Sequence, residues 1–228
     1  MYIYGKNIAK EAIDKDENIK QAFLYEKFHD KDLLDRLINK DIDIKYKSKY
    51  DLDKIEPGNH QGIILEVADY EYASLDEVLK DEVIIMLDHL EDPHNLGAII
   101  RTSEAAGINS IIIPKDRSVR VNSTVIKVSV GAIKNVKIAM ATNLVNTLKE
   151  LKEKGYWVIG TDMEGTDFKE IDYKGKIVLV IGSEGKGISK LVKDNCDFMA
   201  KIPMNGKVNS LNASVAAALV IYEAVRNR

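Results

Sequence analysis

Three short segments of the chain place polar residues at spacings that suit a ligand site, and the first of them contains an arginine. Arg101 lies one helical turn beyond Gly97, so both residues share one face of a predicted helix that begins near Asn95. A guanidinium can hold a phosphate or a developing negative charge with its planar fork of donors, and we expect Gly97 to leave room for a substrate beside it. The structural alternative is that Asn95 or Asp92 caps the helix and that Arg101 pairs with Glu104.

A glycine-rich segment, Gly182–Ser189, directly follows the predicted strand 177–181 and precedes a helical pattern. The carboxyl ends of strands are where α/β proteins bind ligands. The glycine spacing is G-x-x-G-x-G, which is neither the dinucleotide fingerprint nor a P-loop, and the next strand ends in Pro203 instead of an acidic residue. These features count against a nucleotide-dependent oxidoreductase. A tight turn explains the glycines equally well, but Glu184 within that turn has no evident packing use.

The third segment, Ile202–Ser214, leaves a predicted strand through a loop that contains proline and glycine and then enters the last helix. Ser210, Asn212 and Ser214 are polar residues at the start of a helix that is otherwise apolar. Capping accounts for one of these three residues. Asn212 carries both a donor and an acceptor, which suits a residue that faces a ligand.

The elements that must position these segments alternate between short apolar strands and helices from Val83 onward. Continuous apolar strands separated by helices indicate a parallel sheet that is covered on both faces. The predicted strands are 83–87, 110–113, 136–140, 156–160, 177–181 and 198–202, and the predicted helices are 95–106, 122–133, 143–154 and 211–226. The last helix has an apolar stripe that needs a partner surface, formed by Leu211, Val215, Ala218, Leu219, Tyr222 and Val225.

Residues 1–70 have a mixed pattern of their own and predict a small separate α/β domain. Its predicted helices are 6–13 and 30–39, and its predicted strands are 21–26, 41–49 and 62–68. Residues 71–82 are strongly charged and predict a linker with one helical turn. The strand 41–49 would put Lys45, Lys47 and Lys49 on one face. This basic strip suits RNA, although an edge strand protected by lysines explains it equally well.

Basic residues of the second domain are better candidates for phosphate contacts. Lys115, Arg117 and Arg120 directly follow the predicted strand 110–113. His60 and Gln61 precede a strand of the first domain, where they could contact RNA or simply begin that strand.

The composition narrows the classes of protein to which this chain can belong. The 228 residues are 45% hydrophobic and 30% charged, and their net charge of −3 counts against a protein that coats nucleic acid without specificity. Residues 1–82 hold 13 Lys and Arg against 20 Asp and Glu, a net of −7, whereas residues 83–228 hold 20 against 16, a net of +4. An RNA partner would therefore be attracted chiefly by the second part of the chain.

Several kinds of site and location can be set aside from the sequence. The single cysteine, Cys196, excludes an intramolecular disulfide, and the four histidines match no metal-ligand spacing. The longest apolar run, 213–222, is interrupted by Ser214 and is too short to span a bilayer, and the N-terminus has no apolar signal core. We expect a cytoplasmic protein without a structural metal.

Taken in order, the motifs N-x-G-x-x-x-R, G-x-E-G-x-G and I-P-M…S-L-N-x-S-x-A resemble those of the SpoU family of knotted (SPOUT) methyltransferases, over roughly residues 83–228. Residues 117–118 and 129–132, which lie between these motifs, also resemble the family. Each motif alone has low to moderate specificity, whereas the ordered set is highly specific. The first domain, through residues 4–5 and 60–62, more loosely resembles the ribosomal-protein-like RNA-binding domain of the ribosomal RNA guanosine 2'-O-methyltransferases in this family.

The resemblance implies an α/β fold in which a parallel-sheet methyltransferase domain, residues 83–228, contains a deep trefoil knot. A small α/β substrate-binding domain, residues 1–70, and a linker, residues 71–82, would precede it. S-adenosylmethionine would sit bent in the knot, and the chain would form a homodimer to which the last helix contributes. The positions that carry over to cofactor binding are Gly182, Ile202, Leu211, Thr161 and Met204.

The implied reaction is transfer of a methyl group to the ribose 2'-hydroxyl of one nucleotide, expected to be a guanosine of large-subunit ribosomal RNA. The expected catalytic residues are Arg101, Asn95, Glu184, Ser210 and Asn212, and the expected RNA contacts are Lys45, Lys47, His60, Arg117 and Arg120. Because a guanidinium gives up its proton very reluctantly, we expect Arg101 to orient the substrate and stabilise charge while the other four residues hold its geometry. A transfer RNA methyltransferase and a non-catalytic RNA-binding protein on the same fold are the alternatives.

Overall fold

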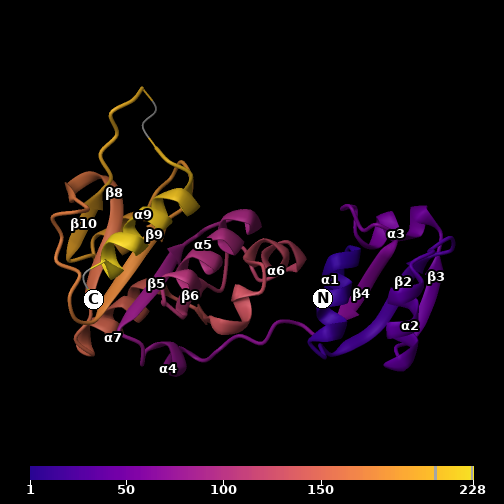
Figure 1. Ribbon diagram of the computed structural model, residues 1–228. Coiled ribbons are helices and arrows are strands. Elements are labelled where there is room, and N and C mark those ends of the chain that lie inside the picture. Colours follow the sequence, from indigo (N-terminus) through magenta and orange to yellow (C-terminus); the bar gives the residue numbers. More distant parts are fainter. Residues whose placement is uncertain (208–209, 227) are drawn as a thin grey trace. The chain divides into compact units, whose positions relative to one another are not determined.

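The computed structural model describes residues 1–207, 210–226 and 228, and these residues form two compact units (Figure 1). The N-terminal unit contains residues 1–71 and the short segment 121–123, and the C-terminal unit contains residues 72–120 and 124–228. Ala73 pairs with Ala139 of the large sheet in an isolated bridge, and Val78 and Leu79 are buried in the core of the C-terminal unit. Most of the segment predicted as a linker is therefore part of that unit.

The N-terminal unit is a four-stranded sheet with the strand order β1-β4-β2-β3. The pairs β1–β4 and β4–β2 are antiparallel, and β2–β3 is parallel. Its elements are β1 (Tyr2–Tyr4), α1 (Lys6–Asp14), β2 (Ile19–Tyr25), α2 (Lys31–Asn39), β3 (Ile44–Lys47), α3 (Lys49–Ile55) and β4 (Ile63–Val67). The predicted mixture of helices and strands is confirmed, and β3 lies at an edge of the sheet.

The predicted strand 41–49 is too long, because a helix begins inside it. The Ser48 side chain caps α3 and accepts a hydrogen bond from the Asp51 backbone N–H at 3.2 Å. A capping serine takes the backbone out of the strand and into the first helical turn. Only Lys45 and Lys47 belong to the edge strand, and the predicted strip of three lysines is wrong at Lys49.

The C-terminal unit contains a six-stranded sheet with the order β10-β8-β9-β5-β6-β7, in which every strand pair is parallel. The predicted parallel sheet is confirmed. The strands are β5 (Val83–Asp88), β6 (Ser110–Pro114), β7 (Lys137–Ala141), β8 (Trp157–Asp167), β9 (Ile177–Gly182) and β10 (Phe198–Lys201). The helices are α4 (Leu75–Val78), α5 (Pro93–Ala105), α6 (Ser123–Ser129), η1 (Ala132–Asn135), α7 (Leu144–Glu153), α8 (Lys190–Lys193) and α9 (Ala213–Val225).

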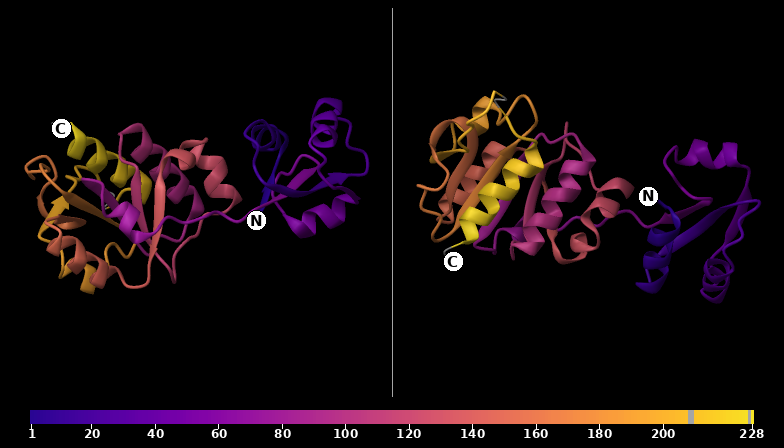
Figure 2. Two further views of the ribbon diagram at one scale, coloured as in Figure 1. Left: turned by 90° about the horizontal axis from the view of Figure 1, so that it is seen from below. Right: turned by 45° about the horizontal axis from the view of Figure 1, so that its top comes forward.

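Helices cover both faces of this sheet, as Figure 2 shows. On one face α9 packs against α5 and β9, and α5 packs against η1. On the other face lie α4 and α7, whose leucines Leu144, Leu148 and Leu151 join the apolar core of the strands. Burial of a helix stripe against each sheet face explains why these strands are apolar on both sides.

Two elements of the C-terminal unit differ from their predicted extent. The predicted helix 122–133 is divided into α6 and η1, because Val130 (φ 49°) and Gly131 (φ 84°) adopt left-handed backbone conformations. The strand β8 continues to Asp167, and its pairing with β10 jumps from Gly160 to Thr166, so residues 161–165 bulge out between the two strands. Periodicity alone does not reveal a bulge of this length.

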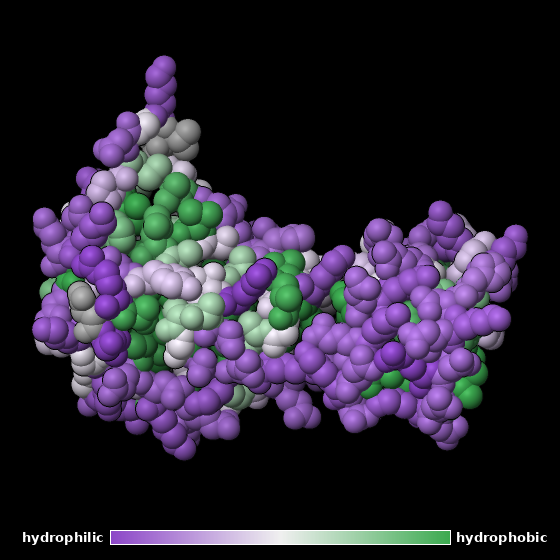
Figure 3. Space-filling view, in the orientation of Figure 1, coloured by the Kyte–Doolittle hydropathy of each residue, from purple (hydrophilic) through white to green (hydrophobic). Residues whose placement is uncertain are grey.

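The last helix buries one face and exposes another. Its buried residues are Ala213, Ala217, Val220, Ile221 and Ala224. The exposed face carries Val215, Leu219 and Tyr222, which are 47%, 40% and 53% exposed, and Figure 3 shows hydrophobic surface over α9. Leu211 lies before the helix, because Asn212 is its cap. None of the described helices combines the length and apolar character needed to cross a lipid bilayer.

Candidate functional site

The three polar segments converge at the Glu184 carboxylate. Its Oε1 atom accepts hydrogen bonds from Asn95 Nδ2 at 2.9 Å and from Asn212 Nδ2 at 2.5 Å, and the Ala213 backbone N–H approaches it at 3.4 Å. Asn212 Nδ2 also donates to Asn95 Oδ1 at 2.9 Å. We call Asn95, Glu184 and Asn212 the polar triad.

The parallel register explains why Asn95 meets Glu184 and Asn212, which lie 89 and 117 positions further along the chain. Asp88, the last residue of β5, lies opposite Gly182, the last residue of β9, so the connections that follow both strands leave the sheet at the same edge. Asn95 is in the first turn of α5, and Glu184 is in the turn after β9. The connection after β10 returns to this edge before α9 begins.

Capping and ligand-site functions are divided between different residues. Asp92 caps α5, since its side chain accepts from the His94 backbone N–H at 2.9 Å, and this leaves the Asn95 side chain for the triad. The Asn212 Oδ1 atom caps α9, accepting from the Ser214 backbone N–H at 2.9 Å and from Ser214 Oγ at 2.6 Å. Asn212 therefore has both functions: its side-chain oxygen caps α9, and its side-chain nitrogen donates to Asn95 and Glu184.

Hydrogen bonding and burial fix the geometry of the triad. Asn95 is 4% exposed, so its amide needs partners inside the protein. Glu184 and Asn212 supply one acceptor and one donor for it. Because Asn95 is buried, displacing either partner would leave a buried amide group unpaired, which favours the observed arrangement.

The glycines around Glu184 form a tight turn, in agreement with one of the two interpretations of their spacing. Ser183 and Gly187 exchange backbone hydrogen bonds of 3.1 and 2.9 Å, and Gly185 and Gly187 have φ values of 77° and 65°. A Cβ atom on Gly182 would lie 2.2 Å from the Gly187 carbonyl carbon, so only glycine fits there. The turn presents Glu184 to Asn95 and Asn212.

Asp88 is a site residue that the sequence reasoning missed. Its side chain is 1% exposed, and Oδ2 accepts from the Ser189 backbone N–H at 2.6 Å. This bond ties the end of the glycine turn to the end of β5. The signal that could have revealed it was an acidic residue directly after a wholly apolar strand.

Arg101 is exposed, and its guanidinium has no hydrogen bond or ion pair with any residue that the structure describes. The alternative pairing with Glu104 is wrong, since Glu104 Oε1 accepts from Asn135 Nδ2 at 2.9 Å. No bond joins Arg101 to the triad among the described residues, and its expected orienting role stays a prediction. Arg101 is six residues beyond Asn95, which places the two on different faces of α5.

Gly97 serves helix packing instead of making room for a substrate. A Cβ atom at Gly97 would lie 2.7 Å from Val128 Cβ and 3.1 Å from the Val125 carbonyl oxygen. The missing side chain lets α5 approach α6 closely. The expected space beside Arg101 is therefore filled by the protein itself.

The five predicted cofactor residues lie at the same edge of the sheet. Thr161 and Gly182 belong to the strands β8 and β9, and the other three lie between β10 and α9. Thr161 Oγ1 donates to the Val180 carbonyl at 3.2 Å, beyond the last paired residues of β8 and β9. Ile202, Met204 and Leu211 are apolar but only half-buried. Gly182 is buried against the glycine turn. Half-buried apolar side chains at this edge suit a ligand that has apolar as well as polar parts.

Ser210, like Arg101, is a predicted catalytic residue that does not join the triad in the described part of the chain. It is exposed, and within the described part of the chain it has no hydrogen bond to Asn95, Glu184 or Asn212. Val208 and Asn209, which precede it, lie outside the described residues.

The residues expected to contact RNA lie in three different places. Lys45 and Lys47 lie on the edge strand β3. Arg117 and Arg120 are exposed in the connection after β6, which is anchored to the Leu90 carbonyl by Ser118 Oγ at 3.0 Å and by the Val119 backbone N–H at 2.7 Å.

His60, in contrast, is 7% exposed and both of its ring nitrogens are bonded. Nδ1 accepts from the Gly62 backbone N–H at 3.0 Å, and Nε2 lies 3.0 Å from Asp53 Oδ1. Its ring holds the loop before β4 in place, and its expected contact with RNA stays a prediction. The described residues contain no group of three or more His, Cys, Asp or Glu side chains that could hold a metal ion.

Two family models match the chain. The model of the SpoU rRNA methylase family matches residues 82–222, and the model described as RNA 2'-O ribose methyltransferase substrate binding matches residues 2–73. A Bacillus subtilis protein named as a TrmH family tRNA/rRNA methyltransferase is 44% identical over 100% of this chain and 96% of its own length. The sequence similarity therefore extends over both compact units.

Solved structures of other proteins share the fold of this chain. The AdoMet-bound rRNA methyltransferase from Sinorhizobium meliloti has a TM-score of 0.74 and 25% identity, covering 99% of this chain and 86% of that one. The TrmH/SpoU tRNA modifying enzyme of A. aeolicus has a TM-score of 0.60 and 33% identity, covering 67% of this chain and 79% of that one.

Proposed function

Because the chain belongs to the SpoU rRNA methylase family, and is thereby an RNA methyltransferase, we propose that it methylates a ribose 2'-hydroxyl of ribosomal RNA with S-adenosylmethionine as the donor. The observation that carries this proposal is the polar triad, which joins the three family motifs through one carboxylate oxygen.

The residues at the triad's sheet edge fit the proposed methyl donor. Ile202, Met204 and Leu211 offer half-buried apolar surface, and Gly182 allows the backbone of the glycine turn to approach closely. The S. meliloti relative was crystallised with AdoMet. When bound, the donor supplies a methyl group on a positively charged sulfur. The knot implied by the family resemblance remains part of this proposal.

Arg101 is proposed to orient the RNA. Its free guanidinium can bind the phosphate next to the target ribose or the developing oxyanion with two parallel hydrogen bonds. A group that stays protonated at neutral pH does not accept the hydroxyl proton, so positioning is its contribution. The triad fixes the turn and the helix ends around the reacting groups, and Ser210 belongs to the loop that completes this edge.

Ribosomal RNA is the proposed substrate class, and a guanosine of the large subunit the proposed target. The S. meliloti rRNA methyltransferase covers 99% of this chain, whereas the tRNA modifying enzyme of A. aeolicus covers 67%. The substrate-binding family model also matches residues 2–73. The whole-length likeness therefore favours ribosomal over transfer RNA, and such a substrate would place the protein in the cytoplasm.

A homodimer is proposed from the exposed apolar face of α9. Val215, Leu219 and Tyr222 lie on one side of this helix and are 40–53% exposed. Apolar patches of this kind mark protein interfaces. A second copy of the chain would cover the face in a two-fold arrangement.

Mapping of ribose methylation by mass spectrometry, in ribosomal and transfer RNA from cells with and without the gene, tests the proposed function. We expect one 2'-O-methyl mark of ribosomal RNA to disappear and to return when the wild-type gene is supplied. A gene carrying Glu184→Ala should not restore it. If no mark is lost the proposed activity is wrong, and if the lost mark lies in transfer RNA the substrate class is wrong.

A further inference from the structure

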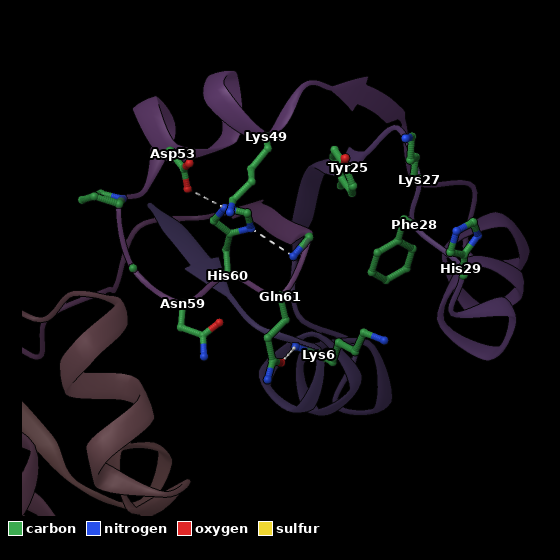
Figure 4. Close-up of a pocket in the computed structure, with 13 residues that line it drawn as sticks. Lys6, Tyr25, Lys27, Phe28, His29, Lys49, Asp53, Asn59, His60 and Gln61 are labelled. Carbon is green, nitrogen blue, oxygen red and sulfur yellow. Dashed lines mark hydrogen bonds and ion pairs between the residues drawn. The ribbon is translucent and has the colours of Figure 1, made fainter.

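The N-terminal unit contains a pocket of about 600 Å³ at one edge of its sheet (Figure 4). The parallel register Tyr25↔Lys47 brings the ends of β2 and β3 to this edge. The antiparallel registers Leu24↔Ile63 and Tyr4↔Ile64 bring the start of β4 and the end of β1 there as well. Connections that adjoin all four strands therefore line the pocket, which is open to solvent on one side.

Lysines surround this pocket. Lys27 and Lys49 lie two residues beyond the paired Tyr25 and Lys47, and both line the pocket together with Lys6. Lys6 Nζ is 3.1 Å from Asp30 Oδ2 and 5.3 Å from the centre of the Phe28 ring, which holds it at the rim. The ammonium groups of Lys27 and Lys49 have no bonded partner among the residues that the structure describes.

The balance of charge in the pocket is opposite to that of its surroundings. Asp53 is the one acidic residue among the lining residues, against three lysines, so the lining has a net charge of +2 with neutral histidines. The Asp53 carboxylate is engaged by His60 at 3.0 Å. The N-terminal unit, residues 1–71 and 121–123, holds 12 Lys and Arg against 16 Asp and Glu, a net charge of −4. A positive pocket in an acidic unit directs an anionic ligand to one place.

We propose that this pocket holds one unpaired nucleotide of the RNA substrate, with Lys27 and Lys49 bound to the phosphates that flank it. The proposal rests on the proposed function and names a subsite for its substrate. The volume lies within the range of pockets that take small ligands, roughly 300–1,000 Å³, and a concave site of this size cannot admit a duplex. Proteins read RNA mainly at loops and bulges whose bases are splayed out of the stack.

Fluorescence anisotropy on the full chain tests this subsite. The probes are a fluorescein-labelled single-stranded RNA of mixed sequence and the same strand annealed to its complement. For Lys27→Ala/Lys49→Ala we expect the Kd for the single strand to rise about tenfold, and the slope of log K against log salt to fall by about 1.4, because two phosphate contacts are lost. The Kd for the duplex should change much less.

The matched control is Lys15→Ala/Lys20→Ala, which removes the same charge from the opposite end of the same unit, where α1 ends and β2 begins. Thermal unfolding should show that both double variants are folded. Wild-type single-strand affinity and salt slope in Lys27→Ala/Lys49→Ala would overturn the proposal, as would an equal loss in the control pair.

Methyl transfer to ribosomal RNA separates this proposal from the proposed function. For the pocket variant we expect a raised KM for RNA with kcat nearly unchanged, and unaltered binding of S-adenosylmethionine by calorimetry. An active wild type with an unchanged KM in the pocket variant rejects the pocket alone. A wild type that binds single-stranded RNA through Lys27 and Lys49 but transfers no methyl group rejects the proposed function alone.

Discussion

At the scale of single residues, one oxygen atom organises the candidate site. Glu184 Oε1 receives donors from Asn95, Asn212 and the backbone of residue 213. Hydrogen bonds to a charged acceptor are stronger than those between neutral groups. Glu184 therefore has a bonding role that its position in a glycine turn does not suggest. Its loss would detach the glycine turn from Asn95 and Asn212.

Arg101→Lys is predicted to lower kcat by about 100-fold, because an ammonium group cannot reproduce the planar fork that orients a phosphate or an oxyanion. Thermal stability should be unchanged, since Arg101 is exposed and unpaired among the described residues. The measurement is single-turnover methyl transfer to ribosomal RNA, with Arg36→Lys as control, at a partly exposed arginine of α2 that pairs with Asp14 and Asp32. Near-normal turnover in Arg101→Lys would contradict the orienting role.

At the scale of elements, the contact between α5 and α6 depends on Gly97. A Cβ atom added at this position would lie 2.7 Å from Val128 Cβ, its nearest side-chain neighbour. The close approach sets the position of the helix that carries both Asn95 and Arg101.

Gly97→Ala is predicted to lower the free energy of unfolding by about 1–3 kcal/mol through overpacking. Val128→Ala should restore part of that loss in the double variant, because the two side chains compete for one space. Urea unfolding followed by Trp157 fluorescence measures both effects. If the losses in the free energy of unfolding are strictly additive in the double variant, the side chains at positions 97 and 128 do not compete for the same space.

The segment before β5 is attached to the sheet by Asp81. Its Oδ2 atom accepts hydrogen bonds from Ser110 Oγ and from Lys137 Nζ, the latter at 2.9 Å. Burial raises the pKa of Asp81, but these bonds and the Lys137 charge outweigh burial and hold the pKa below its ordinary value of 3.8. A lowered pKa in the folded state means that the ionised carboxylate stabilises the fold.

This stabilisation is complete above pH 3.8 and is lost as the pH falls through the lower folded pKa. Asp81→Asn is therefore predicted to reduce stability at pH 7 by up to about 1 kcal/mol, as for partly exposed ion pairs, and the difference from wild type should shrink below pH 3.8. Urea unfolding at pH 7 and pH 3 measures this difference, with Glu91→Gln as an exposed control. A difference that does not depend on pH would contradict the assignment.

At the scale of the whole molecule, the two units differ in charge and in task. The C-terminal unit, with a net charge of +1, holds the candidate site, and the N-terminal unit, with a net charge of −4, contains a pocket lined by three lysines. Local charge at the pocket, and not the net charge of the unit, is what a bound nucleotide would experience within a Debye length of about 10 Å.

Leu219→Glu is predicted to convert a dimer into a monomer, because it places a charge in the middle of the exposed apolar face of α9. Light scattering coupled to size-exclusion chromatography should give twice the chain mass for the wild type and one chain mass for the variant. Leu191→Glu changes a leucine that is 69% exposed on α8 and should leave the dimer intact. A monomeric wild type would refute the dimer.

The succession of strands and helices along the C-terminal unit and its parallel sheet could be predicted from the amino-acid sequence, and the resemblance of the ordered motifs to a known family predicted that they form one site. Such features depend on local periodicity and on the spacing of a few residue types. Helix α3, the break at Val130 and Gly131, and the bulge after Gly160 were not predicted, because each depends on a cap, a backbone angle or a register that competes with periodicity.

Only the tertiary structure decided what several residues do. Gly97, expected to face a substrate, packs against α6, and His60, expected to face RNA, is buried between Asp53 and Gly62. Lys27 received no role from the sequence pattern, yet it lines the same pocket as Lys49. The physical reason is that a residue's type limits its chemistry, whereas its neighbours in space are brought together by strand registers and helix crossings that no local pattern contains.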